Sequence, residues 1–409
     1  MTELRRVVIV GGGIAGWTVA TSLRAGGYDG EIVLVEREPA CYDRPPLSKT
    51  ALIDDAPLDA LAFADPVATA GLRLDVRCGR SAVRLDAPQR AVVLDDGTRL
   101  AADAVVLSTG GRAREGAFPG AQLPGVLTLR TYADVVAARA LRGRTIAVVG
   151  GGLIGAEAAA AFRLAGSPVV LIDPNAVPGS RVFGPTLAAH LHGMHVANGV
   201  DVRTDTVAAV TEDRGRLRVA LTHGAPVTVD GVLVGTGIRL DTALAADGGV
   251  EVSDGIVVDA DGRTSVPGIF AAGDVTRRRM PVGLAASRGH WDAARQDGLA
   301  VAAAILGCPA EPAGADWFWS DRYGHHVEVV GDMSASGAEI VRPGQHPTVF
   351  RIDGGMLRAA ASVDDPMSVR AARRLIERGV AVEADLLADP AVPLRSLLQK
   401  KTASAVSPS

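Results

Sequence analysis

A glycine-rich segment near the N-terminus constrains the fold more strongly than any other part of this sequence. An apolar run at residues 7–10 is followed by Gly11, Gly13 and Gly16, then by a helical stretch and a second apolar run that ends at Glu36. In such a segment the first glycine permits a tight turn, the second lets a pyrophosphate approach the backbone, and the third lets the helix pack against the sheet. The helix start also offers N–H groups to the phosphates. The order of elements predicts a dinucleotide site in which Glu36 binds a ribose, and the alternative is a glycine turn with a structural role only.

The same order of elements recurs in the middle of the chain. A strand-like run that starts at Thr145 leads into Gly150, Gly152 and Gly155, and an Ala-rich helical stretch connects them to an apolar run that ends at Asp173. Two such units indicate two dinucleotides, or one dinucleotide and its redox partner. A carboxylate at position 173 favours a free ribose 2′-hydroxyl and repels a 2′-phosphate, so NADH is expected rather than NADPH. The alternative is that Asp173 is an ordinary loop residue.

The length and charge of the chain limit the other possibilities. With 409 residues, two or three domains are expected. The formal net charge of −4 argues against nucleic acid as the main ligand. No apolar run approaches the roughly 20 residues that a membrane-spanning helix needs, and the N-terminus lacks a signal-peptide core. A cytoplasmic protein is expected.

The sulfur and imidazole side chains do not suggest a metal centre. The three cysteines lie far apart in the sequence and form no Cys-x-x-Cys pair: Cys41, Cys78 and Cys308. A disulfide framework, a zinc site and an iron–sulfur cluster are not expected, since each needs grouped thiolates. His190, His192 and His195 would occupy two faces of a helix, and we expect them at the surface rather than on a metal. Any redox chemistry must belong to a bound organic cofactor or to a partner.

The segment at residues 41–49 carries two cations beside two prolines. Pro45 and Pro46 should prevent a helix at their own positions and lead into one at about Ser48. Arg44 and Lys49 either contact a pyrophosphate or are solvated cations on a loop, and spacing alone does not decide between the two. Farther along, Asp274 follows an apolar strand, where it would either cap a helix or accept a hydrogen bond from a sugar hydroxyl.

The motifs together resemble the FAD-dependent NADH:ferredoxin reductases that serve bacterial oxygenases, the putidaredoxin-reductase-like family. The matching segments are Gly11 to Gly16 with Glu36, residues 44–49 (RPPLSK), Thr109-Gly110, residues 129–131 (LRT), Gly150 to Gly155 with Glu157, residues 264–274, His290-Trp291 and residues 317–321 (WFWSD). The resemblance covers essentially the whole chain, and RPPLSK and WFWSD are more specific than the glycine motifs. A neighbouring family with one flavin-side cysteine is the rival, but its Cys-Gly context is not found here.

The resemblance implies a glutathione-reductase-like α/β fold with two Rossmann-type nucleotide-binding domains and a C-terminal α+β interface domain. The expected FAD-binding domain comprises residues 1–112 and 236–309, and the expected NAD-binding domain comprises residues 113–235. Residues 310–401 would form the C-terminal reductase domain. The small, polar tail at 402–409 is expected to be disordered.

The resemblance also assigns roles to individual residues. Lys49 and Glu157 are the expected catalytic pair, beside the flavin face where nicotinamide docks. The expected FAD-binding residues are Gly11, Gly13, Ala15, Gly16, Glu36, Arg44, Lys49, Ala82, Thr109, Arg130, Asp274 and Trp291. The expected NAD-binding residues are Gly150, Gly152, Leu153, Ile154, Gly155, Glu157, Asp173 and Gly237.

The function implied by the resemblance is electron transfer from NADH through FAD to a [2Fe–2S] ferredoxin that feeds an oxygenase, expected to be a haem-thiolate monooxygenase. The ferredoxin is expected to dock near Arg277, Arg278 and Arg279, on a monomer or weak dimer. Two alternatives remain: a flavoenzyme that acts directly on a small organic substrate or oxygen, and a non-enzymatic flavoprotein that responds to NAD.

Overall fold

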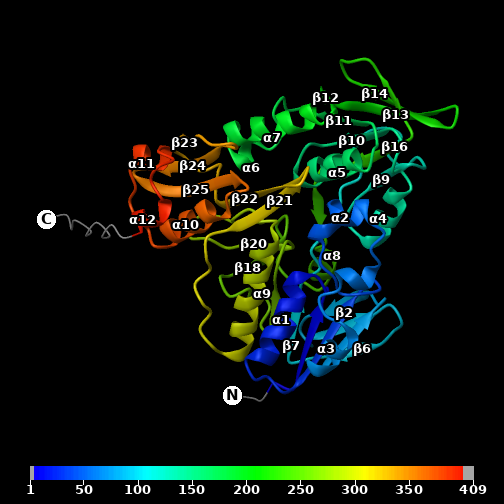
Figure 1. Ribbon diagram of the computed structural model, residues 1–409. Helices are drawn as coiled ribbons and strands as arrows, with labels where there is room; N and C mark the ends of the chain where they lie inside the picture. Colours follow the sequence, from blue (N-terminus) through cyan, green and yellow to red (C-terminus); the bar gives the residue numbers. More distant parts are fainter. Residues whose placement is uncertain (1–3, 399–409) are drawn as a thin grey trace. The chain divides into compact units, whose positions relative to one another are not determined.

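The computed structural model describes residues 4–398 and divides into two compact units (Figure 1). The first unit contains the described residues through Pro46 together with Ala56–Arg112 and Ile238–Ala313. The second contains Leu47–Asp55, Ala113–Gly237 and the described residues from Gly314 onward. The assignment of FAD, NAD and interface domains stays a prediction, and the expected tail at 402–409 lies outside the described residues.

A five-stranded parallel sheet forms the centre of the first unit. Its strand order is β19-β7-β1-β2-β3. The strands are β19 (Ile269–Ala271), β7 (Ala104–Leu107), β1 (Arg6–Val10), β2 (Glu31–Glu36) and β3 (Leu74–Cys78). β1 and β7 are buried almost throughout because both faces of the sheet are covered, which explains their continuous Val-rich and Leu-rich sequences. The carboxyl ends of β1, β2 and β7 lie at one edge, where the first glycine loop begins.

Two helices of the first unit run side by side against this sheet (Figure 1). They are α1 (Ile14–Ala25), which follows the first glycine loop, and α9 (Trp291–Leu306). The close approach depends on Gly298 of α9, where a Cβ would lie 2.7 Å from the Ala15 carbonyl oxygen and 2.9 Å from Cβ of Thr18. A separate antiparallel sheet contains β4 (Ala82–Asp86), β5 (Ala91–Leu94) and β6 (Arg99–Ala101).

The second unit repeats the parallel arrangement, with the strand order β12-β11-β10-β16-β9. The strands are β12 (Asp201–Thr204), β11 (Val169–Asp173), β10 (Ile146–Val149), β16 (Gly231–Val234) and β9 (Val126–Thr128), and α5 (Leu153–Leu164) connects β10 to β11. An antiparallel meander of β13 (Val207–Asp213), β14 (Arg216–Leu221) and β15 (Val227–Val229) packs on it. The two parallel sheets confirm the predicted α/β class.

The C-terminal part of the second unit is an antiparallel sheet with helices on both faces. Its order is β21 (Trp317–Arg322), β22 (His325–Gly331), β25 (Met356–Val363), β24 (Thr348–Asp353) and β23 (Ala338–Arg342). Successive residues of β25 point to opposite faces: Ala359 and Ala361 pack with α7 (Pro185–Ala197), and Ala360 packs with α10 (Pro366–Glu377). The small alanines let both helices approach the sheet.

The other elements are short. They are the 3-10 turns η1 (Pro45–Ser48) and η2 (Leu58–Leu61), the helices α2 (Thr50–Ile53), α3 (Pro66–Gly71), α4 (Tyr132–Arg139), α6 (Ser180–Phe183), α8 (Ala243–Asp247), α11 (Ala384–Ala388) and α12 (Leu394–Leu397), and the strands β8 (Gly111–Ala113), β17 (Ile238–Leu240), β18 (Ile256–Val258) and β20 (Thr276–Arg278). Within residues 4–398, no helix has both the length and the apolar character that crossing a bilayer requires.

Candidate functional site

The first glycine loop has a different steric role for each of its glycines. Gly11 has a φ of +106°, and a Cβ there would lie 2.2 Å from the carbonyl oxygen of Ser108. A Cβ on Gly16 would lie 2.0 Å from the Gly11 carbonyl oxygen. By contrast, a Cβ on Gly13 would meet nothing within 4 Å, so the backbone there borders open space. An exposed backbone at the start of α1 fits a pyrophosphate.

Glu36 lies directly beside this loop. Its carboxylate accepts hydrogen bonds from the N–H of Gly12 at 2.6 Å and from the N–H of Glu38 at 2.9 Å. The side chain is only 5% exposed, which means that its orientation is fixed by these bonds and by packing. The structure therefore brings the predicted ribose acid and the predicted phosphate loop together.

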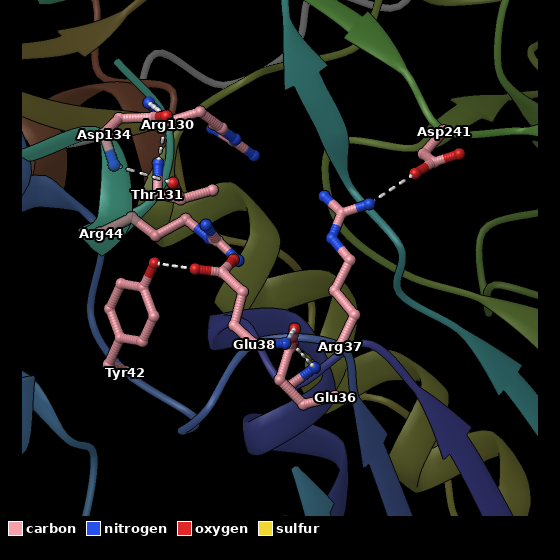
Figure 2. A network of polar contacts seen from close by, with 10 residues as sticks. Glu36, Arg37, Glu38, Tyr42, Arg44, Arg130, Thr131, Asp134 and Asp241 are labelled. Atoms are coloured by element: carbon pink, nitrogen blue, oxygen red, sulfur yellow. Dashed lines mark hydrogen bonds and ion pairs between the residues drawn. The ribbon is translucent and has the colours of Figure 1, made fainter. Parts of the chain in front are cut away.

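Arg44 belongs to a polar network in the same unit. Its guanidinium lies 2.8 Å from Glu38, and the Tyr42 hydroxyl donates to the other oxygen of that carboxylate (Figure 2). Nearby, Arg37 and Arg112 each lie 3.0 Å from the carboxylate of Asp241. Glu38 is thus an Arg44 partner that the sequence motifs did not indicate, while contact between Arg44 and a pyrophosphate stays a prediction.

The second glycine loop repeats the geometry of the first. Gly150 has a φ of +99°, a Cβ on Gly152 would meet nothing within 4 Å, and a Cβ on Gly155 would lie 1.9 Å from the Gly150 carbonyl oxygen. Asp173 accepts from the N–H of Gly151 at 2.7 Å, just as Glu36 accepts from Gly12. Leu153 and Ile154 form the first turn of α5, and Gly237 follows β16 with a φ of +104°.

Asp173 receives two more hydrogen bonds from Asn175. The backbone N–H and the side-chain amide of Asn175 donate to the other carboxylate oxygen at 2.8 and 2.9 Å. The carboxylate is 8% exposed. A carboxylate held in a fixed orientation at the end of β11 suits a ribose diol and disfavours an added phosphate.

A buried carboxylate on α5 collects side chains from three distant parts of the second unit. Glu157 is 3% exposed and accepts from the hydroxyls of Ser48 at 2.5 Å and Ser320 at 2.7 Å. Lys49 Nζ lies 3.4 Å from Glu157, so the predicted pair forms. The ammonium group also lies 3.7 Å from Asp321 and 5.6 Å from the ring centroid of Trp319.

The segment Leu47–Asp55 is held near this carboxylate by arginines from the end of α4 and from the turn that follows it. Arg139 donates to the carbonyl of Ala51 at 2.8 Å, and Arg142 donates to that of Ile53 at 2.6 Å and pairs with Asp55. Although this segment lies within the range expected for the FAD domain, it packs with the second unit.

Arg322 is a charged residue of this site that the sequence motifs did not single out. It is 5% exposed, and its Nε has no hydrogen-bond partner among the described residues. Burial lowers the pKa of Arg322 to about 10, and the nearby charge of Glu157 acts in the opposite direction. Ser48, Ser320 and Arg322 were missed although each adjoins a residue that the motifs did identify.

The other predicted FAD residues all lie in the first unit except Arg130. The Thr109 hydroxyl donates to the backbone of Asp241 at 2.7 Å, and the Trp291 indole donates to Asp43 at 2.7 Å. Ala82 is the first residue of β4. Ala15 lies in the first turn of α1. Gly273 packs closely against it, because a Cβ added at Gly273 would lie 2.8 Å from the Cβ of Ala15.

Asp274 and Arg130 are placed by backbone geometry. Asp274 lies between β19 and β20, and its carbonyl accepts from the Ser287 hydroxyl at 2.8 Å. Arg130 directly precedes Thr131, which forms a reciprocal capping box with Asp134 at the start of α4 (Figure 2). Their contacts with a cofactor stay predictions.

The predicted docking arginines are all ion-paired. Arg277 lies 3.6 Å from Asp254, Arg278 lies 3.2 Å from Asp297, and Arg279 lies 2.6 Å from Glu251. These carboxylates reduce the positive charge that the sequence alone suggested. Arg279 is the most exposed of the three, at 57% of its side chain.

The expected surface position is wrong for one of the three histidines of α7, His195. His195 is only 2% exposed rather than at the surface, because α7 packs on the C-terminal sheet and its ring lies 2.7 Å from the Tyr323 hydroxyl. Burial, reinforced by the charge of Arg322, lowers the pKa of His195 to about 3. Cys41 and Cys78 lie close together despite their sequence separation, and a hydrogen bond with Cys78 and burial raise the pKa of the Cys41 thiol. Both thiols are free.

Known proteins resemble this chain in both sequence and architecture. The family model for the pyridine nucleotide-disulphide oxidoreductases matches residues 5–298, and a reductase C-terminal model matches residues 317–398. A ferredoxin–NAD(+) reductase subunit of the benzene 1,2-dioxygenase system from Pseudomonas putida is 35% identical over 403 residues, which cover 96% of this chain and 97% of that protein.

Two solved structures have the same fold over nearly the full length. The covalent putidaredoxin reductase–putidaredoxin complex contains a chain with a TM-score of 0.90 and 30% identity, covering 96% of this chain and 98% of that one. The ferredoxin reductase for the CYP199A2 system from Rhodopseudomonas palustris has a TM-score of 0.91 and 28% identity, covering 96% and 99%. Both similarities extend through the C-terminal sheet.

Proposed function

Because this chain belongs to the pyridine nucleotide-disulphide oxidoreductase family, and within it to the ferredoxin–NAD(+) reductases, we propose that it passes electrons from NADH to a [2Fe–2S] ferredoxin that serves an oxygenase. The chain is an oxidoreductase, and the cofactors of its family, FAD and NAD(H), are those that the sequence motifs predicted. The observation that carries the proposal is the pair of glycine loops, each with a buried acid that accepts from the loop backbone.

The residues of the first unit fit FAD. The open backbone at Gly13 would accept the pyrophosphate and Glu36 would bind the adenosine ribose. When bound, FAD supplies the conversion between a two-electron hydride donor and a one-electron acceptor. We expect one non-covalent FAD per chain, which acid precipitation of the protein should release.

The residues of the second unit fit NADH. Asp173 would bind the adenosine ribose, and the open backbone at Gly152 would approach the pyrophosphate. Lys49 and Glu157 would orient the nicotinamide, with Ser48 and Ser320 fixing the carboxylate through hydrogen bonds. No proton needs to be transferred by a side chain, which fits a buried carboxylate already satisfied by two hydroxyls and an ammonium group.

Stopped-flow spectroscopy tests this function. Mixing the yellow holoenzyme with NADH should bleach the flavin absorbance rapidly, and a second mixing with a [2Fe–2S] ferredoxin should restore it while the ferredoxin becomes reduced. NADPH should act much more slowly. If oxygen or a small organic acceptor reoxidises the enzyme faster than any ferredoxin does, the chain is a flavoenzyme that acts directly on a substrate. A stable complex with slow reduction would favour a binding protein.

The class of oxygenase has two candidates. The sequence resemblance led us to expect a haem-thiolate monooxygenase, and one structural relative comes from a CYP system. A ring-oxidising dioxygenase is the second candidate, because a more similar relative at 35% identity is a subunit of a benzene 1,2-dioxygenase system. Comparing reduction rates for ferredoxins from the two kinds of system would distinguish them.

For the partner surface we propose docking near Arg277, Arg278 and Arg279. The support is their exposed or half-exposed position close to Asp274 in the sequence, together with the acidic character expected of such ferredoxins. Because each arginine is paired with a carboxylate, we propose only a modest electrostatic contribution to ferredoxin docking. Arg279, the most exposed of the three, would make most of it. A monomer or weak dimer and a cytoplasmic location also remain predictions.

A further inference from the structure

Four side chains from separate elements of the second unit meet beside the C-terminal sheet. His325 begins β22, His346 lies between β23 and β24, and Asp364 directly follows β25. His190 comes from α7, more than a hundred residues earlier in the chain. The proposed electron transfer uses none of them.

Three of these side chains present ligand atoms to a common point. His325 Nδ1 lies 2.7 Å from Asp364 Oδ2, and His346 Nε2 lies 3.9 Å from the same oxygen. One nitrogen of each imidazole and one carboxylate oxygen all lie within 4.8 Å of one another. Tetrahedral zinc, with bonds of about 2.0–2.2 Å, places its ligand atoms about 3.3 Å apart. Small side-chain rotations would therefore suffice to bind an ion.

The backbone fixes Asp364 in the orientation that this geometry needs. Its φ of +55° is uncommon for a residue other than glycine, although aspartate and asparagine tolerate it best. Its second carboxylate oxygen accepts from the N–H of His326 at 2.8 Å, and its own N–H donates to the His326 carbonyl at 2.8 Å. The remaining oxygen, Oδ2, is thereby directed at His325 and His346.

His190 completes the cluster from the opposite side of His346. Its Nε2 lies 2.9 Å from His346 Nδ1, and the two rings meet edge to face with their centroids 5.1 Å apart. A histidine that binds a metal through Nε2 carries its proton on Nδ1 and usually donates it to a partner.

We propose that His325, His346 and Asp364 bind one divalent transition-metal ion of the zinc type, with His190 as a positioning residue that accepts from His346. Two imidazoles and one carboxylate suit zinc better than calcium or magnesium, which prefer oxygen ligands. The fourth position is open to water, because the side chains of His325 and Asp364 are 34% and 42% exposed. The ion would connect three strand ends of the C-terminal sheet to α7.

Zinc binding to the untagged, chelator-treated holoenzyme tests the proposal. Titration calorimetry with zinc chloride, supported by metal analysis after dialysis, should give one tight site per chain. His346→Ala and His325→Ala should weaken binding by at least about 100-fold, and His190→Ala by about 10–100-fold. Zinc should also raise the melting temperature of the wild type but not of His346→Ala.

Two further variants make the outcome decisive. Asp364→Asn tolerates the same backbone conformation and keeps an oxygen acceptor, so it should retain flavin and NADH–ferricyanide activity yet lose tight zinc binding. His192→Ala lies on α7 two residues from His190 but outside the cluster, and it should bind zinc like the wild type. Unchanged tight binding in His346→Ala and His325→Ala would overturn the proposal, as would binding by the wild type only at millimolar zinc.

Discussion

Glu36 and Asp173 occupy equivalent positions in two loops, and each accepts a hydrogen bond from the residue between the first two motif glycines. The motif spacing predicted both acids, because the strand, glycine turn and helix before each acid lead the chain into the neighbouring parallel strand of the same sheet. The acid at the end of that strand therefore lies beside the glycine turn. Ser48, Ser320 and Arg322 were not predictable in the same way. They reach Glu157 only through packing of residues more than a hundred positions apart.

Replacement of Asp173 should change the coenzyme preference. If Asp173 binds the ribose as proposed, Asp173→Ala would remove the acceptor for the diol and the group that repels a 2′-phosphate, so NADH should bind more weakly by about 1–2 kcal/mol, or roughly 5- to 30-fold. The dissociation constant for NADPH should change less, so the difference in affinity between NADH and NADPH should become smaller. Stopped-flow titrations measure both values. Asp201→Ala, an exposed carboxylate on the adjacent strand, is the control, and unchanged NADH binding in Asp173→Ala would make that acid an ordinary loop residue.

Lys49 and Glu157 should behave as one unit. Glu157→Ala removes the nearer carboxylate from a mostly buried ammonium group, and Lys49→Ala removes the cation from a buried carboxylate, so either change should slow hydride transfer more than it weakens NADH binding. The two effects should not add. A double-mutant cycle on the reduction rate measures the coupling energy. The exposed pair Arg203 and Asp201 on β12 is the reference, for which little coupling is expected.

His195 should make the fold less stable in mild acid. Its pKa is about 3 when folded and 6.5 in the reference state, so the unfolded chain binds the proton first as the pH falls below about 6.5. The resulting loss of stability between pH 7 and pH 5 is about 2 kcal/mol. His195→Gln should remove this part of the pH dependence in urea unfolding, whereas His223→Gln, at an exposed position, should not. Parallel pH profiles for wild type and His195→Gln would contradict the assignment.

At the scale of elements, a single glycine sets the distance between two neighbouring helices. α1 and α9 pack closely because Gly298 has no side chain beside Ala15 and Thr18. The sequence predicted the helix after the first glycine loop but not its contact with α9, since a glycine inside a helix looks only unfavourable until its neighbour is known. The prediction of no helix at Pro45 and Pro46 was right for an α-helix only. Both prolines lie in a 3-10 turn, whose first positions need no N–H donor.

Gly298→Ala provides the test of this packing. The added Cβ would lie 2.7 Å from a backbone oxygen and 2.9 Å from a Cβ, so the helices must separate, at a cost of about 1–3 kcal/mol of stability. Flavin retention should fall as well, since α1 starts at the first glycine loop. Gly193→Ala is the matched control, because it lies within α7 where a Cβ meets nothing within 4 Å. That change should stabilise the protein by about 0.5–1 kcal/mol, and equal melting temperatures for both variants would contradict this prediction.

At the scale of the whole molecule, the repeated motifs predicted two nucleotide-binding sheets. The sequence did not predict which unit each connecting segment packs with. Residues 47–55 follow the first nucleotide motif in sequence but pack against α4 and α5 of the second unit. The arginine run at 277–279 illustrates the same limit for charge. Its three cations are adjacent in sequence, whereas the carboxylates that pair with them come from residues 251, 254 and 297.

These pairs decide how ferredoxin docking should be tested. Arg278 pairs with Asp297, which also accepts from the N–H of Gly273 at 3.3 Å, so its reversal would disturb the fold. Arg279 is exposed, and Arg279→Glu would both remove a cation and place a second carboxylate beside Glu251. If docking there is electrostatic, the association rate with an acidic ferredoxin should fall by roughly 3- to 10-fold at low salt, and its salt dependence should flatten.

The decisive comparison uses two electron acceptors and a second exposed arginine. Ferricyanide needs no docking surface, so NADH-driven ferricyanide reduction by Arg279→Glu should match the wild type, which separates a docking effect from a folding effect. Arg84→Glu, on the exposed side of β4, changes the net charge of the molecule equally and should leave the ferredoxin rate nearly unchanged. Equal losses in the two variants would mean that the ferredoxin responds to overall charge. An unchanged ferredoxin rate and salt slope in Arg279→Glu would exclude this surface, because reversing its most exposed cation must alter the encounter of two charged proteins wherever that cation contributes to it.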